Sequence, residues 1–446
     1  MSRTVLFLDH GLFVGAAQRF ARLGWDVKYA PTWKSSYPSS NQHDIGVGLD
    51  GIEVVDDVWE VILKDSERWA EDGEYGADGM LKNPAVDLVV CPDLYFPGEV
   101  TMLRNLGYPT WGAGLSSNLK QSGEDLEIDR IKWKKMLVDL GLPYAPYNVC
   151  RGDEALEAYI KSHAGRHYVK GSKCRADFES QECLNLGYIQ AWLRDVRDVL
   201  GERVHNYDFI VERALENAIE AAWDTFCIRG EFPTCGLLGV EQKCLAYCAH
   251  FTDAIPEQFT APYSALSSYL RRTGYRQFFS IETLIEEDGT PNPSDVCARV
   301  GLPCGASQLE GYENIDDVMV AGAAGEVLDP KPTAPYCVEL VLQSMSHKRQ
   351  VVPLPKDLEE CTYLINCWKS KAGFEVMPQP RIRTPSGLAC LGTVVAMGKS
   401  LDEACEKCAE YGKELASLSA DLEVTPSAFD DIKKKFDDLA NRGVAL

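Results

Sequence analysis

Two short apolar runs with a helical segment between them restrict the fold of this chain more than any other feature. Residues 4–9 (TVLFLD) and 25–30 (WDVKYA) are typical of buried strands, and residues 15–24 (GAAQRFARLG) have the spacing of a helix that ends at Gly24. Two neighbouring parallel strands need a crossover connection, which is usually a helix. Strand, helix and strand in this order therefore predict a parallel α/β sheet.

A further strand and helix extend this pattern and define a candidate binding edge. Residues 86–93 (VDLVVCPD) predict the strand, and the helix runs from Pro97 to Gly107. Ligands bind beyond the carboxyl ends of such strands. This rule makes the polar residues that follow the strands substrate candidates: Asp9, His10, Asp93 and Tyr95. The alternative for Asp93 is that it only caps a helix.

The residue pattern changes twice along the chain. At 446 residues the chain is longer than chains that fold around one ordinary hydrophobic core. We predict three domains: 1–125, 126–334 and 335–446. The middle part is rich in strands and includes a predicted hairpin at 220–239 with its turn at Arg229-Gly230-Glu231. The last part combines strands with a helix that Ser400 caps, which predicts a small α+β domain.

Charge and composition exclude several classes of protein. The formal net charge of −22 repels phosphate backbones, so we expect no direct binding to nucleic acid. No apolar run reaches the roughly 18 residues of a membrane helix, and the first residues do not resemble an export signal, so we expect a cytoplasmic protein without a membrane partner. The 16 cysteines then predict free thiols, with Cys405 and Cys408 as buried helix residues rather than metal ligands.

Four segments follow one another in an order that resembles a known superfamily. They are DRIKWKKMLVDLG (129–141), the pair at 169–170, VERAL (211–215) and FFSIETLIEEDGTPNPSDVCARVG (278–301). Their order and spacing are similar to those of ATP-grasp carboxylate–amine ligases, and residues 391–408 resemble the C-terminal domain of phosphoribosylamine–glycine ligase. The resemblance implies an ATP-grasp fold, in which an N-terminal parallel α/β (pre-ATP-grasp) domain precedes a nucleotide-binding domain and a small C-terminal domain.

The resemblance also implies ATP and Mg²⁺ as cofactors. Dense phosphate charge requires cations, and Lys170 and Arg130 match two family positions that supply them, Lys170 also with a part in catalysis. Because Lys170 ends a strand, we expect its removal to change stability little. Residues 171–180 (GSKCRADFES) match the loop that closes over the phosphates. The other nucleotide-binding residues that the resemblance implies are Ser172, Lys173, Glu212, Leu215 and Glu220, with Glu212 at the adenine amino group or the ribose.

Two carboxylates form the strongest catalytic pattern in the sequence. Glu282 and Asp295 lie on two strands joined by a Gly-Pro turn, which brings them face to face, and the resemblance makes them magnesium ligands. Cys297 stands where the family has an amide or acidic ligand. Because Mg²⁺ does not favour sulfur, a water, a backbone oxygen or Asn292 completes the shell, or a second ion binds weakly. Arg299 resembles the arginine that steadies the transferring phosphoryl group, and its alternative role is a structural salt bridge.

These residues predict an ATP-dependent ligase that forms an amide through an acyl phosphate, with a small carboxylate and an amine as partners. Cys304 and Gly305 stand where phosphoribosylamine–glycine ligase has acidic residues, which favours a different substrate pair, such as an amino acid and an unusual amine. That glycine ligase itself and a non-catalytic ATP-binding regulatory protein are the alternatives. A homodimer is compatible with the sequence.

Overall fold

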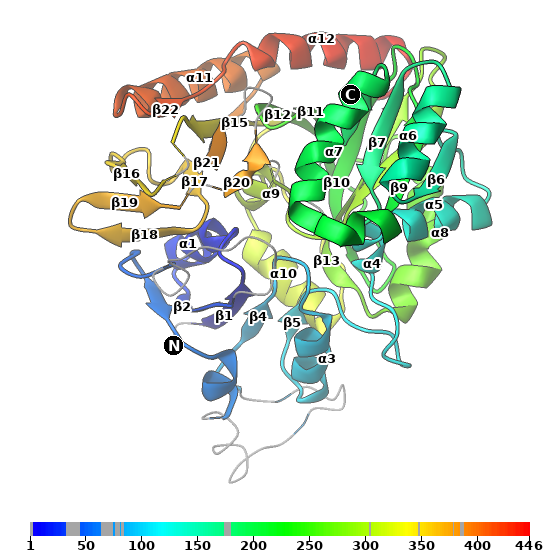
Figure 1. Cartoon of the computed structure of the whole chain (residues 1–446). Helices are drawn as coiled ribbons and strands as arrows, with labels where there is room; N and C mark the ends of the chain where they lie inside the picture. Colours follow the sequence, from blue (N-terminus) through cyan, green and yellow to red (C-terminus); the bar gives the residue numbers. More distant parts are fainter. Residues whose placement is uncertain are drawn as a thin grey trace.

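The computed structural model describes residues 3–32, 45–63, 75, 81, 84–173, 180–302, 305–346, 348–377, 379–383 and 388–446. Within these residues the fold is mixed α/β, with one parallel sheet and three antiparallel sheets (Figure 1). The mixed fold that the sequence predicts is thereby confirmed.

The N-terminal part forms the predicted parallel sheet, with strand order β3-β2-β1-β4-β5. Its strands are β1 (Thr4–Asp9), β2 (Asp26–Pro31), β3 (Ile52–Val54), β4 (Leu88–Val90) and β5 (Thr110–Trp111), and its helices are α1 (Val14–Arg22) and α3 (Pro97–Asn105). Val5 and Phe7 pack in the same hydrophobic cluster as α1, whereas Leu6 and Leu8 pack with α3. Because alternate residues of a strand face opposite sides, β1 is covered on both faces.

A four-stranded antiparallel sheet with order β6-β9-β7-β8 follows. Its strands are β6 (Tyr147–Arg151), β7 (His167–Gly171), β8 (Gln181–Cys183) and β9 (Asp208–Arg213), and its helical segments are α4 (Asp125–Ile128), α5 (Arg130–Asp139), α6 (Asp153–Ser162), α7 (Leu186–Leu200) and the 3₁₀ helix η1 (Gly201–Asn206). Helix α5 begins after Asp129, whose carboxylate accepts the Lys132 backbone N–H at 3.1 Å. This N-cap fixes where the predicted amphipathic helix starts.

The largest sheet has the order β14-β13-β10-β11-β12-β15-β21-β17, with β20 and β22 paired at its side. Its strands are β10 (Ile219–Ile228), β11 (Gly236–Gln242), β12 (Ala246–Thr252), β13 (Arg276–Ile285), β14 (Pro291–Cys297), β15 (Tyr336–Ser344), β17 (Thr362–Leu364), β20 (Gln379–Arg383), β21 (Ala389–Gly398) and β22 (Leu422–Glu423). The pairing of β12 with β15 carries the sheet across residue 335. The three domain boundaries stay a prediction.

Helices cover both faces of the large sheet. They are α8 (Glu257–Arg272), α9 (Gly305–Gly311), α10 (Ile315–Ala324), α11 (Leu401–Ser417) and α12 (Ala428–Asn441). The thiol of Cys408 in α11 donates to the Val338 carbonyl, and a Cβ at Gly412 would meet Leu340, whereas the Ser307 N–H in α9 donates to Glu339. Since Leu340 and Glu339 are successive strand residues, α11 and α9 lie on opposite faces. Figure 1 shows α11 and α12 running together along one side of the molecule.

The C-terminal part confirms the predicted helix cap. The Ser400 hydroxyl accepts the Glu403 backbone N–H at 3.2 Å, and the Glu403 carboxylate accepts the Lys399 N–H at 2.9 Å. These two bonds form a capping box at the start of α11. A small three-stranded sheet of β16 (Gln350–Val352), β19 (Gly373–Val376) and β18 (Cys367–Ser370) lies beside this part.

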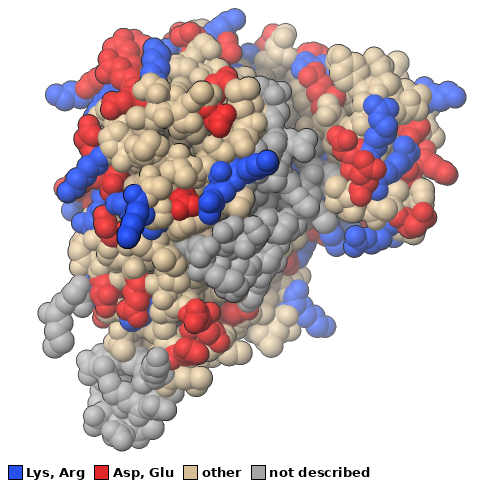
Figure 2. Space-filling view, turned by 60° about the vertical axis from the view of Figure 1, so that its left-hand side comes forward, with Lys and Arg blue, Asp and Glu red and all other residues tan. Residues whose placement is uncertain are grey.

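The surface and the thiols agree with the composition. On the face in Figure 2, Lys and Arg are interspersed with Asp and Glu among the described residues. The cysteines within the described part of the chain are free thiols, as predicted, and Cys405 and Cys408 are buried in α11. In that same part, every helix is too short or too polar to cross a bilayer.

Gly392 permits a close approach between two strands of the large sheet. It has φ 140°, it lies where the β15–β21 register shifts, and a Cβ on it would stand 2.0 Å from the Tyr363 carbonyl oxygen. We expect Gly392→Ala to lower the free energy of unfolding by at least about 2 kcal/mol, because both the backbone and the packing become strained. Urea unfolding measures this. Gly98→Ala in α3, where the added Cβ meets no atom within 4 Å, is the control, and equal losses in both variants would contradict the assignment.

Candidate functional site

Helix α5 and strands β7, β9 and β14 place five charged side chains together. Arg130 and Lys134 lie one turn apart on α5, Lys170 is in β7, Glu212 in β9 and Asp295 in β14. All five are buried, with at most 7% of each residue exposed. The predicted residues Arg130, Lys170, Glu212 and Asp295 therefore do meet in one cluster, which we call the buried charge cluster.

Lys170 connects the two carboxylates of this cluster. Its Nζ lies 2.8 Å from Glu212 Oε2 and 3.1 Å from Asp295 Oδ2, and it donates to the Ser294 hydroxyl at 3.3 Å. Desolvation lowers the pKa of Lys170, but the charges of Asp295 and Glu212 outweigh it and raise the pKa above its ordinary value. Lys170 is thus a buried, charged contact between the four-stranded sheet and the large sheet. From the sequence, we expect that removing Lys170 changes stability little, because that expectation assumes a strand-end lysine in solvent. The burial of Lys170 does not fit that expectation.

Lys134 is a member of the cluster that the sequence analysis missed. Its ammonium pairs with Glu212 Oε1 and donates to the Ser294 carbonyl at 3.0 Å. The sequence spacing could have indicated this residue, because Lys134 follows Arg130 by four residues and so shares its helix face. Trp133 Nε1 donates to the same carbonyl at 3.0 Å, which fixes α5 against β14.

The cluster has one positive charge in excess, since three cations face two carboxylates. Arg130 Nε lies 3.4 Å from Asp295 Oδ1, and its NH1 donates to the Gly171 carbonyl at 3.0 Å. Burial raises the pKa of Glu212, but Lys170 and Lys134 outweigh it and hold the pKa below the ordinary value. Both carboxylates therefore have cationic partners. Burial lowers the pKa of Lys134, against the opposing charge of Glu212.

A second group of charges surrounds Lys243, just after β11. Its ammonium lies 2.9 Å from Glu220, 3.1 Å from Glu241 and 3.1 Å from Glu282. One oxygen from each carboxylate lies within 4.8 Å of the others, and the three are half-buried. Desolvation opposes the charge on Lys243, but the carboxylates outweigh it and raise its pKa well above the ordinary value. We call this group the carboxylate triad. Glu241 and Lys243 are further residues that the sequence analysis missed.

The backbone register brings the two groups side by side. Glu282 in β13 is the direct partner of Asp295 in β14, so their Cα atoms are about 5 Å apart and their side chains share a face. The predicted face-to-face pairing is therefore confirmed as a register. The side chains differ in their contacts, since Asp295 turns to Lys170 and Glu282 to Lys243. Cys297 and Asn292 lie on the same strand as Asp295, and the Cys297 thiol donates to the Arg299 carbonyl at 3.7 Å.

Arg299 lies between the end of β14 and the parallel sheet. Its Nε is 3.1 Å from Glu127 Oε1, whose other oxygen accepts the Ala298 N–H at 2.6 Å. The Val300 N–H donates to the Pro92 carbonyl at 3.1 Å, directly after β4. The salt-bridge alternative for Arg299 is thus present in the structure, at a position beside the predicted substrate edge.

That edge contains the four predicted substrate residues. The Asp9 carboxylate accepts the Phe13 N–H at 3.0 Å and the Tyr29 hydroxyl at 2.6 Å, so it orders the connection from β1 to α1. His10 is buried between the carbonyls of Thr32 and Leu94, at 2.5 and 3.2 Å. Burial, together with the nearby Asp93, raises the pKa of Asp9 to about 6.

Asp93 and Tyr95 complete the edge. Burial raises the pKa of Asp93 to about 6, against the opposing charge of Arg299. Its carboxylate accepts the N–H of Leu94, and Tyr95, with φ 74°, donates its N–H to Glu124 at 3.0 Å. The side chain contacts order this edge, and its binding of substrate stays a prediction.

The remaining predicted nucleotide residues lie around the buried charge cluster. Ser172 is buried, and its backbone pairs with Arg130 N and Asp208 O, each at 3.0 Å. Lys173 is exposed and lies 3.6 Å from Asp129. Leu215 is half-buried after β9. Residues 174–179 of the predicted phosphate loop and Cys304 lie outside the described residues.

Lys134 offers a test of the buried charge cluster through stability. We expect Lys134→Met to lower the free energy of unfolding by about 3 kcal/mol, because it removes a counter-charge from buried Glu212. Lys135→Met, an exposed neighbour on α5, changes it by less than about 0.5 kcal/mol. Urea unfolding of both variants measures the difference. Equal stabilities would mean that the lysine at 134 does not compensate Glu212.

Comparison with known proteins identifies the fold. No protein-family model matches the sequence, and no curated protein matches it. Solved structures match along nearly the whole chain. Phosphoribosylamine–glycine ligase from Thermotoga maritima has 13% identity and a TM-score of 0.58, and it covers 94% of this chain and 97% of its own.

Two further solved structures also match along nearly the whole chain. The biotin carboxylase domain of the Hydrogenobacter thermophilus 2-oxoglutarate carboxylase, in complex with MgADP and bicarbonate, has 13% identity and a TM-score of 0.60, covering 99% of this chain and 96% of its own. The L-amino acid ligase from Bacillus licheniformis has 15% identity and a TM-score of 0.55, covering 95% and 98%. The resemblance in sequence order is thus confirmed in three dimensions, and this chain has the multidomain ATP-grasp fold.

Proposed function

We propose that this protein is an ATP-dependent carboxylate–amine ligase that forms an amide through an acyl phosphate. The observation that carries the proposal is the buried charge cluster beside the carboxylate triad. An excess cationic charge next to a group of half-buried carboxylates suits a polyphosphate and the divalent ion that accompanies it. The shared fold with ligases supports the same reaction class.

The cations of the buried charge cluster are suited to the phosphates of ATP. Lys170 and Arg130 already have carboxylate partners that hold them in place, which reduces the entropy lost when an anion binds. Lys134 adds charge from the same helix face as Arg130. Glu212 compensates the charges of the two lysines, which is a structural role. Its predicted contact with adenine or ribose would be a second role.

The residues present fit a magnesium ion. Glu282 and Glu220 offer carboxylate oxygens, which are the ligands that Mg²⁺ prefers, and Glu241 adds a third from β11. Asp295 lies beside Glu282 in the register. When bound there, the ion would neutralise phosphate charge. Lys243 stands among these carboxylates and supplies the positive charge that they need without a metal.

The proposed reaction has two steps that need no protein nucleophile. An oxygen of the substrate carboxylate attacks the γ-phosphorus, the bond to the β-phosphate oxygen breaks, and ADP leaves. An amine nitrogen then attacks the acyl carbon, phosphate leaves, and the nitrogen loses a proton. Lys170 and Arg130 hold the phosphates through these steps, and Arg299 steadies the transferring group from the substrate edge.

An ATP-binding regulatory protein is the second candidate. It is favoured by Cys297, which is a poor ligand for Mg²⁺, and by Lys243, which already compensates the carboxylate triad. The two candidates differ in turnover, since a regulator binds ATP without a carboxylate-dependent reaction.

Release of ADP tests the proposed function. We expect the protein with ATP and Mg²⁺ to release ADP only when mixtures of amino acids and amines are added, as a coupled assay measures. Lys170→Met should reduce this release at least about 100-fold, because a phosphate contact is lost. Lys399→Met, at an exposed position, should leave it unchanged. ATP binding without substrate-dependent ADP release would favour the regulator instead.

Magnesium dependence tests the metal assignment separately. We expect EDTA to abolish ADP release, and Glu282→Gln to raise the Mg²⁺ concentration for half-maximal rate about tenfold, because one charged ligand becomes neutral. Glu287→Gln, on the turn after β13, is the matched control. An identical magnesium titration in wild type and Glu282→Gln would remove Glu282 from the metal site.

A further inference from the structure

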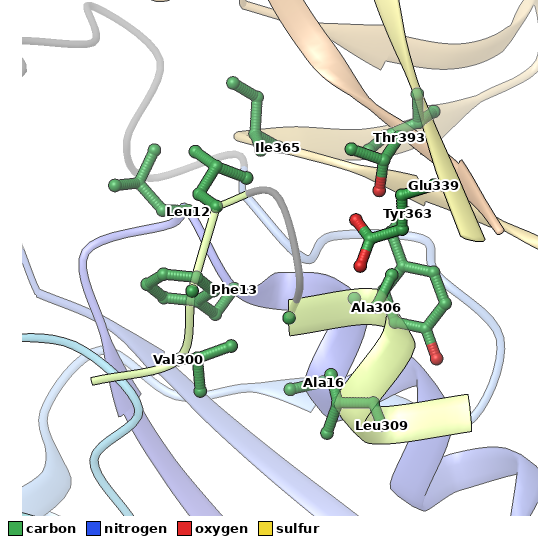
Figure 3. Close-up of a pocket in the computed structure, with 15 residues that line it drawn as sticks. Leu12, Phe13, Ala16, Val300, Ala306, Leu309, Glu339, Tyr363, Ile365 and Thr393 are labelled. Carbon is green, nitrogen blue, oxygen red and sulfur yellow. The ribbon is translucent and has the colours of Figure 1, made fainter. Parts of the chain in front are cut away.

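A pocket lies where the parallel sheet, α9 and the C-terminal strands meet. Its walls are largely apolar and come from the β1–α1 connection, from the segment after Arg299 and from β17 and β21. Figure 3 shows Phe13, Val300 and Leu309 on one side and Thr393 with Glu339 on the other. The pocket therefore joins segments that are far apart in the sequence, on the face of the large sheet that α9 covers.

Glu339 brings a carboxylate into this apolar setting. It is 1% exposed, and its Oε1 accepts the Ser307 backbone N–H at 2.7 Å. Among the side chains that the structure describes, no lysine, arginine or histidine forms an ion pair with it. Figure 3 shows its carboxylate directed toward the space between Phe13 and Ala306. Burial raises the pKa of Glu339 to about 7, against the effect of the bonds from Ser307 and Thr393.

The pocket adjoins the proposed reaction site. Val300 in its wall directly follows Arg299. Across the sheet, Glu241 in β11 is the register partner of Tyr247 in β12, which is the partner of Glu339 in β15. Glu339 thus shares a face with the carboxylate triad, at about 10 Å between the Cα atoms of Glu241 and Glu339, which is two strand spacings.

We propose that this pocket binds the amine substrate of the ligase through an alkyl group held by the apolar walls and an ammonium group paired with Glu339. This proposal rests on the proposed function and specifies its substrate class. A buried carboxylate that pairs with no cation among the described side chains is costly, and an ammonium ligand supplies that charge. A carboxylate ligand would instead meet like charge, which assigns the pocket to the amine and not to the acid.

Direct binding tests the pocket without any turnover. Isothermal titration calorimetry at pH 8 compares isoamylamine with its neutral analogue isoamyl alcohol and its acidic analogue isovalerate, with no nucleotide added. We expect the amine to bind at least about tenfold more tightly than either analogue, because only the amine pairs with Glu339. Equal binding of amine and alcohol, or no binding of the amine, would overturn the proposal.

Variants locate the binding. Glu339→Gln should weaken the amine at least about tenfold and leave the alcohol unchanged, and Ala306→Leu should weaken both by filling the pocket. Glu375→Gln, a buried carboxyl in the three-stranded sheet, is the matched control and should bind like wild type. Unchanged amine binding in Glu339→Gln and Ala306→Leu would place the ligand elsewhere.

The two proposals fail in different ways. Amine binding that depends on Glu339, without substrate-dependent ADP release, would support the amine-binding pocket and contradict the proposed ligase function. The opposite result is substrate-dependent ADP release in which Glu339→Gln does not change the KM for isoamylamine. It would support the ligase function and overturn the assignment of the pocket to the amine.

Discussion

Opposite charges taken out of water hold the four-stranded sheet against the large sheet. Lys170 in the small sheet reaches Glu212 beside it and Asp295 in the large sheet, so one ammonium sets how the two sheets meet. Desolvated charges are stable only when each has a partner in good geometry. The cluster therefore fixes the position of α5 and β14, and the same fixed cations are suited to hold a polyphosphate without first being ordered.

Local patterns predicted those parts of the fold that depend on neighbours in the sequence. The short turn between β13 and β14 predicted that the two strands pair, but the register that opposes Glu282 and Asp295 also depends on a shift between Glu282 and Thr283, without which Ser294 would face Glu282. The alternation of strands and helices at the N-terminus gave the parallel sheet, and Ser400 with Glu403 gave the start of α11. In each case, hydrogen bonding or side-chain period within a few residues decides the structure.

Contacts between distant strands could not be predicted in this way. The site residue Lys170 was predicted, but its direct ion pairs were not, because its partners Glu212 and Asp295 come from other strands. Glu282 meets Glu241 and Lys243 only through the pairing of β10 with both β11 and β13. Lys134 was missed for a different reason: a lysine on an amphipathic helix is usually exposed, and only tertiary packing buries this one.

On the face of the large sheet that α9 covers, the charged groups change from β14 to β15. At the β14 end, Asp295 lies among cations, in the middle the carboxylate triad shares Lys243, and at β15 Glu339 has apolar neighbours. Under the two proposals, charge would place the phosphates of one ligand at α5 and the ammonium of the other at Glu339. Because each end would repel the opposite arrangement of charges, this sheet would give the substrates of the proposed ligase their orientation as well as affinity.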